Sequence, residues 1–402
     1  MKCLAREKVE KGLKGNVLHD CHAEILALRT FNRALVEECM KLARDRDTHM
    51  EQQEREEGQI VRLRRPRQPK DRDTEAEVVE AHAHAHEQPF EIRENIRLHL
   101  YCSEAPCGDA SMELTMALQE DATPWAAPAP TPTLSPATAT ILPTDALHGR
   151  SYFSHLGIVR RKPSRPDAPP TFSKSCSDKL ALAQCTSVLS GLAAVLIHPA
   201  NAYLCSIVLP ESQYVAAACE RAFAEKGRMD DAAALLSRRA GGGRGYRWEP
   251  FVVKTTAREF QFSRRSSPSA DATTKSETEV KGTGKLVPSN LSTLAFNSTQ
   301  ETLINGVLQG RRQDDPRGAS SVSRRGMWEA ACQVARHLDS SSTPDCSHTA
   351  DKGCLGGLRQ AMYGDLKRSS GFSVRREVKL LACGLSLKGW VANSGDEEWA
   401  LE

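Results

Sequence analysis

Residues 17–24, with the sequence Val-Leu-His-Asp-Cys-His-Ala-Glu, constrain this chain more than any other stretch. They place the imidazole of His22 two residues before the carboxylate of Glu24, where a run of apolar residues with helical spacing begins. An imidazole can bind zinc, and a carboxylate that stays off the metal can carry protons. A helix N-terminus adds positive partial charge beside both groups. A His-x-Glu triplet alone is weak evidence, because most such triplets lie on helix surfaces.

Two further segments each place one soft metal ligand where a predicted helix begins. Residues 105–109 follow a predicted strand, and residues 175–179 open a helix that we expect to extend to about residue 192. Cysteines at helix N-termini are readily deprotonated. One imidazole and two thiolates leave the fourth position of zinc open, which is typical of a catalytic site rather than a structural one. The three motifs together predict zinc ligands at His22, Cys107 and Cys176 and a proton carrier at Glu24.

Composition narrows the class of protein. The chain has 402 residues, enough for one or two domains, and a net charge of only +3. Its 13 cysteines lack the regular, dense spacing of a secreted disulfide scaffold. We find neither a run of about 18 apolar residues nor an apolar segment at the N-terminus. We therefore expect an intracellular protein of the nucleus, the cytoplasm or both, with no membrane association and no protein partner.

Three segments have the composition of disordered insertions. They are a charged stretch at 48–95, a segment rich in Pro, Ala and Thr at 121–145, and a segment rich in Ser, Thr and Lys at 263–285. The run His82-Ala83-His84-Ala85-His86 resembles a metal site, but its low-complexity setting favours a solvated insertion. Because Met1 lies so close to the first motif, we also expect a single domain over 1–402 that is truncated at its N-terminus.

The remaining ordered elements follow from hydrophobic periodicity. We predict strands at 96–101, 202–209, 249–254, 293–297 and 301–306. We predict helices at 22–47, 176–192, 213–239, 324–338, 355–368 and 375–386, so that the C-terminal part is largely helical.

The three motifs, in this order, resemble the editase domain shared by adenosine deaminases that act on RNA and on tRNA. The resemblance covers nearly the whole chain apart from the insertions. It implies an α/β fold with a cytidine deaminase-like mixed sheet, helices on both faces and an added C-terminal helical half. It also implies zinc ligands at His22, Cys107 and Cys176, with Glu24 moving protons as adenosine is hydrolysed to inosine. The general deaminase signature has Cys-x-x-Cys, whereas Cys107 is followed by Gly108-Asp109-Ala110, which makes Cys176 the candidate third ligand.

Residues 179–185 and 303–310 look like the fungal, tRNA-acting branch of this family. That branch deaminates the adenosine 3′ of the anticodon in alanine tRNA, where unstacked bases enter a pocket at low cost. Three alternatives remain: a deaminase of other RNA, an inactive RNA-binding protein, and a cytidine deaminase of free nucleosides. The last is disfavoured by the missing Cys-x-x-Cys. Residues 160–165, with four basic side chains, could contact RNA phosphates or form a solvated loop.

The family also buries one inositol hexakisphosphate in its C-terminal half, as a structural cofactor. The matching segments offer Arg29, Lys179, Arg324, Tyr363, Lys367, Arg376 and Trp390. Two positions depart from the pattern. Leu182-Ala183 stands where better-known members have Arg-Trp, and His19 stands where the first motif has Asn.

Overall fold

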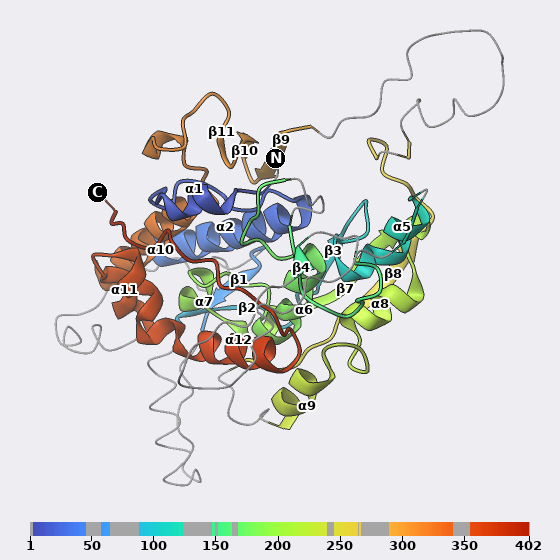
Figure 1. Cartoon of the computed structure of the whole chain (residues 1–402). Coiled ribbons are helices and arrows are strands. Elements are labelled where there is room, and N and C mark those ends of the chain that lie inside the picture. Colours follow the sequence, from blue (N-terminus) through green and yellow to red (C-terminus); the bar gives the residue numbers. More distant parts are fainter. Residues whose placement is uncertain are drawn as a thin grey trace, which may run out of the picture.

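The computed structural model describes residues 3–45, 58–64, 88–119, 121–123, 147–148, 152–162, 168–238, 245–263, 265–266, 289–340 and 354–401. It is a mixed α/β protein in which helices surround several small sheets (Figure 1). In the described part of the chain, no helix combines the length and the apolar character that crossing a membrane requires.

The longest helix, α2 (Ala23–Arg44), organises the molecule. Apolar side chains recur along one stripe of it and are buried, including Leu35, Val36 and Cys39. The helix contains neither Gly nor Pro, and Lys41 and Arg44 complement the negative end of its dipole. Helix α10 (Arg324–Ser340) packs along α2, so the first motif lies beside the C-terminal part of the chain. The helix predicted at 22–47 is confirmed.

The strands form separate small sheets rather than one continuous hydrogen-bonded sheet within the described residues. Strands β3 (Leu98–Tyr101), β7 (Leu204–Pro210) and β8 (Val252–Thr256) are parallel. Strand β2 (Phe90–Ile92) pairs with β1 (Val61–Leu63) antiparallel and with β6 (Ile197–His198) parallel. Strands β9 (Leu291–Phe296), β10 (Thr299–Ile304) and β11 (Val307–Leu308) form a meander next to α2 and α1 (Figure 1).

The prediction that 48–95 is one insertion is wrong at two places. Val61, Phe90 and Ile92 are completely buried in the core, and their strands join β6. Both strands have only three residues and are flanked by charges, so composition averaged over the segment hides them. Residues 46–57 and 65–87, including the alternating histidines, lie outside the described residues, as do most of 121–145 and 263–285.

Most other elements have the predicted types, but residues 213–239 form two helices rather than one, and Cys354–Arg359 form a 3-10 helix. The unpredicted elements include a short helix near the N-terminus, another after the third motif and four strands of two residues each. The helix from Cys176 ends earlier than expected, at Thr186, because Ser187 has a φ of 60°. The remaining helices and strands are α1 (Arg6–Glu10), η2 (Asp109–Ser111), α5 (Met112–Ala117), β4 (Leu147–His148), β5 (Arg160–Arg161), α6 (Cys176–Thr186), α7 (Ala193–Leu196), η3 (Pro199–Asn201), η4 (Glu211–Gln213), α8 (Ala216–Phe223), α9 (Asp230–Arg238), η6 (Pro316–Gly318), η8 (Cys354–Arg359), α11 (Tyr363–Arg368), η9 (Ser370–Phe372) and α12 (Ser373–Leu385).

The C-terminal segment returns to the start of the chain. The rings of Tyr363 and Trp399 stack with centroids 4.6 Å apart. The carboxylate of Asp396 accepts hydrogen bonds from the backbone N–H groups of Leu13, at 2.9 Å, and Gly15, at 3.3 Å. Gly15 has a φ of +71°, and a Cβ there would lie 2.2 Å from the Trp399 ring. The first motif is thus held between α2, α10 and the C-terminal residues.

Candidate metal centre and active site

The three predicted ligands converge from three elements. His22 precedes α2, Cys107 precedes η2 and Cys176 is the first residue of α6. The Nδ1 atom of His22 lies 3.7 Å from Sγ of Cys107 and 3.6 Å from Sγ of Cys176. Ligand atoms bound tetrahedrally to zinc at their usual bond lengths are about 3.6 Å apart. This donor set therefore fits a zinc ion held by one imidazole and two thiolates.

The second and third motifs interlock. The backbone N–H of Ser177 donates to the Cys107 carbonyl at 3.0 Å, and its hydroxyl donates to the Pro106 carbonyl at 2.9 Å. Gly108 has a φ of +105°, and a Cβ there would lie 2.2 Å from Oγ of Ser175. Ser175 caps α6 through a reciprocal pair of hydrogen bonds with Asp178. Glycine after Cys107 is thus required by close approach of the two loops.

The aspartates of these motifs are positioning residues. Asp109 is buried and accepts hydrogen bonds from Gly157 N–H at 2.8 Å and from the Arg221 guanidinium at 3.2 Å. Asp178 is buried and pairs with Arg228 at 2.6 Å. Buried carboxylates are tolerated only when paired in this way.

A buried ionic chain, which the sequence analysis missed, runs from the centre. The Nζ atom of Lys162 lies 3.2 Å from Sγ of Cys176 and 2.8 Å from Oδ2 of Asp20. Lys179 also donates to Asp20, whose other oxygen accepts from the His22 N–H at 3.1 Å. Burial opposes ionisation of Asp20, yet the two ammonium groups hold its pKa well below the ordinary value. Burial lowers the pKa of Lys162, but Asp20 together with the thiols of Cys107 and Cys176 outweighs burial and raises it.

Both interpretations of the basic loop are wrong for Arg160 and Lys162. Their side chains are buried, whereas Arg161 between them is half-buried. Backbone hydrogen bonds from Lys162 to Ser173 and from Ser175 to Arg160 hold this segment as a strand. Side chains alternate between the two faces of a strand, so recognising a strand here would have predicted that Arg160 and Lys162 share one face and Arg161 the other. Arg165 lies outside the described residues.

A cavity of about 730 Å³ opens at the centre. His22, Glu24 and Cys107 form one part of its wall, and Tyr101 and Phe260 form another. Burial and the nearby Cys107 raise the pKa of Glu24. A hydrogen bond from Cys176, helped by the charge of Lys162, lowers the pKa of the Cys107 thiol well below its ordinary value. The site thus combines a thiolate with a carboxylate that holds a proton more readily than usual.

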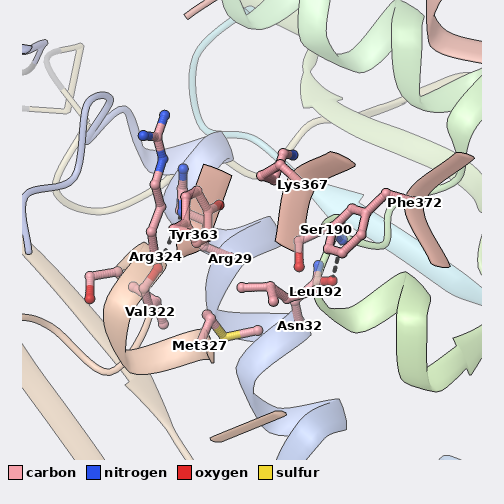
Figure 2. Close-up of a pocket in the computed structure, with 12 residues that line it drawn as sticks. Arg29, Asn32, Ser190, Leu192, Val322, Arg324, Met327, Tyr363, Lys367 and Phe372 are labelled. Atoms are coloured by element: carbon pink, nitrogen blue, oxygen red, sulfur yellow. Dashed lines mark hydrogen bonds between the residues drawn. The ribbon is translucent and has the colours of Figure 1, made fainter. Parts of the chain in front are cut away.

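A second cavity, of about 180 Å³, lies between α2, α10 and α11 (Figure 2). Figure 2 shows Arg29, Arg324 and Lys367 around it, with Tyr363 beside Arg324. Its described lining includes three basic side chains and no acidic one. Burial, together with Arg375 and Lys379 nearby, lowers the pKa of Lys367 to about 7. Concentrated positive charge of this kind fits an anion.

The other three residues predicted to hold the polyphosphate lie outside this lining. The Trp390 ring lies under Lys174, at 4.9 Å, and Lys379, at 5.4 Å, and its buried Nε1 has no hydrogen-bond partner. Lys179 pairs with Asp20. Arg376 is exposed and donates to the Lys367 carbonyl at 3.0 Å.

The assignment of Arg376 to the cluster is therefore a one-residue error on α12. Arg375 and Lys379 lie on the same helix face as the buried Val378 and Ala382. The spacing of four residues between the two basic side chains is the signal that would have found them.

His19 replaces the expected Asn and lies at the edge of the same region. Its Nδ1 atom is 2.8 Å from Nδ2 of Asn393, and its Nε2 atom is 3.5 Å from Oδ2 of Asp396. Burial lowers the pKa of His19 despite the contact with Asp396. The imidazole therefore accepts a hydrogen bond here as a neutral group.

An α/β domain with His-x-Glu at the start of one helix and a cysteine at the start of each of two others, close enough to share a metal ion, has the features of the hydrolytic deaminases. A family model, Adenosine-deaminase (editase) domain, matches residues 1–67 and 67–394, so the chain belongs to this family. The predicted family and the predicted enzyme class, an adenosine deaminase, are confirmed.

Three relatives illustrate the similarity. The chain is 28% identical over 401 residues to tRNA-specific adenosine deaminase 1 of Schizosaccharomyces pombe, covering 99% of this chain and 82% of that protein. It is 32% identical over 187 residues to tRNA-specific adenosine deaminase 1 of Saccharomyces cerevisiae, covering 44% and 37%. It is 33% identical over 109 residues to double-stranded RNA-specific editase B2 of Mus musculus, covering 27% and 11%.

Proposed function

We propose that this chain is a zinc-dependent tRNA deaminase that hydrolyses adenosine to inosine. The observation that carries the proposal is the convergence of His22, Cys107 and Cys176 at zinc-ligand separations, beside Glu24 in one cavity. A cytidine deaminase-like arrangement of the strands around this centre is part of the same proposal.

The residues of the chain divide the work. His22, Cys107 and Cys176 would hold zinc, which when bound lowers the pKa of a water molecule toward neutrality. Glu24 accepts one proton of the attacking water and delivers it to the adenine ring nitrogen, and then carries the proton of the newly added hydroxyl to the amine, which departs as ammonia. Its raised pKa suits a group that must both take and return a proton. Lys162 donates to Cys176 and holds this ligand in place.

The substrate proposal rests on the relatives. Two of them are named as tRNA-specific adenosine deaminases, and the longer match spans 99% of this chain. An anticodon loop presents unstacked bases, so extruding one adenosine into the cavity costs little. We therefore propose the adenosine 3′ of the anticodon of alanine tRNA as the target, and the nucleus or cytoplasm as the place of action. Deamination of another RNA is the second candidate, supported by the similarity to the mouse editase.

We further propose that inositol hexakisphosphate fills the second cavity. Arg29, Arg324 and Lys367 supply positive charge there, and Tyr363 lines the same cavity. Like charges held close together with reduced access to solvent destabilise the fold unless an anion compensates them. The lining of this cavity shares no residue with that of the catalytic cavity, so we expect the polyphosphate to be structural.

The deciding experiment measures inosine formation on an alanine tRNA transcript, with zinc quantified in each preparation. We expect the wild type to form inosine 3′ of the anticodon and Glu24→Gln to lose activity by about 10²–10⁴-fold while retaining zinc. A wild type that contains zinc but forms no inosine on this or any other RNA would overturn the proposal and leave an RNA-binding protein. Absence of zinc would overturn the metal centre.

A further inference from the structure

Exposed aromatic rings gather at the mouth of the catalytic cavity. Phe260 and Tyr101 line it, with side chains 44% and 47% exposed. The ring of Phe262 is 79% exposed and lies 5.7 Å from that of Phe260, with an interplanar angle of 69°. In the part of the chain that the structure describes, nine large apolar side chains are exposed. Four of them, including Leu291, belong to this cavity or touch its wall.

Polar contacts keep the two phenylalanines in this position. Arg265 donates to Glu259 at 2.9 Å, on the turn that carries the rings. It also donates to the carboxylate of Glu104 at 2.9 Å and to the carbonyl of Ser103 at 2.8 Å. Residues 103 and 104 belong to the loop that leads to Cys107. These contacts hold the turn against the loop that leads to Cys107, while its two phenyl rings face solvent. Burial of apolar surface alone would favour turning these rings inward.

Two exposed basic residues precede the rings closely in the sequence. Lys254 and Arg258 are exposed on β8 and on the turn that follows it, and β8 is an edge strand. Exposed cations and exposed rings in one segment match the chemistry of a single-stranded nucleic acid, whose phosphates are negative and whose bases stack on aromatic side chains.

We propose that Phe260 and Phe262 form a stacking platform for the base of a nucleotide next to the reacting adenosine. This inference rests on the proposed function and adds a substrate-positioning element to it. When adenosine enters the cavity toward Glu24, its neighbour in the strand loses a stacking partner. A phenyl ring at the cavity mouth replaces that partner, which lowers the cost of extrusion. The platform is sequence-tolerant, because every base has a π-face.

The test uses an RNA hairpin with the anticodon loop of alanine tRNA and compares Phe262→Ala with the wild type. We expect Kd and KM for the hairpin to rise about 5- to 100-fold, with kcat at saturating RNA roughly unchanged. Phe262→Trp should restore binding, because indole also stacks. Leu380→Ala is the matched control, since this side chain is 67% exposed but lies on α12.

Hairpins that carry an abasic site on either side of the target identify the stacked base. The abasic site at the stacked position should weaken wild-type binding as much as Phe262→Ala does, and the variant should bind this hairpin as the wild type does. Unchanged Kd and KM in Phe262→Ala, or an equal loss on both abasic hairpins, would overturn the platform while wild-type activity sustains the proposed function. If the wild type forms no inosine, the proposed function fails and the platform falls with it.

Discussion

At the scale of single residues, the metal centre depends on side chains that touch no substrate. The carboxylate of Asp20 accepts hydrogen bonds from the ammonium groups of Lys162 and Lys179 and from the backbone N–H of His22. One carboxylate therefore holds groups from three segments in place. Removing one partner of a buried ion pair leaves an uncompensated charge, which typically costs about 3–5 kcal/mol. The residues around the ligands therefore matter to the fold as much as the ligands matter to the chemistry.

We predict that Lys162→Met destabilises the protein by about 3–5 kcal/mol, because, among the described residues, it leaves the partly exposed Lys179 as the one ammonium group paired with the buried Asp20. Zinc content should fall as well, since Cys176 loses its hydrogen-bond donor. Chemical denaturation and zinc analysis measure both effects. Arg161→Met, at the preceding position on the half-buried side of the strand, is the control and should change neither.

Gly108 offers a second prediction at this scale. Gly108→Ala should destabilise the chain by about 2 kcal/mol or more, because Ala resists positive φ and its Cβ would clash with Ser175. Gly384→Ala is the matched control. No atom lies within 4 Å of a Cβ at that position in α12, so this change should be neutral or stabilise the helix by about 0.5–1 kcal/mol. Thermal unfolding separates the two, and equal effects would contradict the interlocked loops.

At the scale of elements, α12 decides whether the second cavity holds a polyphosphate. Arg375 and Lys379 face the basic cluster, and Arg376, between them, does not. Like charges forced together destabilise an anion-free protein and become favourable once an anion binds. A substitution that removes one of these charges should therefore raise stability when no anion is bound and lower it when the anion is bound.

We predict that Lys379→Gln raises Tm of the protein freed of polyphosphate and reduces the increase in Tm that inositol hexakisphosphate produces. Arg376→Gln, on the solvent-exposed face of the same helix, should leave that increase in Tm unchanged. Differential scanning calorimetry with and without the polyphosphate makes the comparison. An equal response of the two variants would mean that the ligand does not contact this face of α12.

At the scale of the whole molecule, the basic cluster makes stability depend on pH. The folded chain holds the pKa of Lys367 at about 7, against an ordinary value of 10.5. The unfolded chain therefore binds more protons between these two values, so the anion-free protein gains stability as pH rises through this window. Below pH 7 the penalty is fully present. Protein atoms surround Lys367 on most sides, but its side chain still reaches solvent, so the gain should be smaller than the full shift implies.

A bound polyanion reverses this trend, because it favours the charged amine. We predict that inositol hexakisphosphate raises Tm more at about pH 6.5 than at about pH 9. The difference between loaded and unloaded protein is compared at each pH, which removes the contribution of other titrating groups. Lys367→Gln should reduce the difference between the two pH values in the increase of Tm that the polyphosphate produces. A larger effect of the polyphosphate at the higher pH would contradict this account.

The sequence by itself determined the chemistry of the centre and the types of most elements. The sequence allowed us to identify His22, Cys107 and Cys176 because each stands where a periodic apolar run begins. Helix N-termini favour thiolates, so these positions are read from local sequence alone. The helix of residues 22–47 and the strands of the C-terminal half were equally readable, because local periodicity specifies them.

Only the tertiary structure decided which charges are buried. Lys162 looked like a loop residue and Arg376 looked like a ligand, yet Lys162 is buried against Cys176 and Arg376 faces solvent. The short strands at Val61–Leu63 and Phe90–Ile92 likewise became strands through pairing with each other and, for Phe90–Ile92, with β6. The physical reason is the same in each case. The burial and pairing of a few residues depend on partners far away in the chain, and the pattern of a segment only a few residues long does not specify those partners.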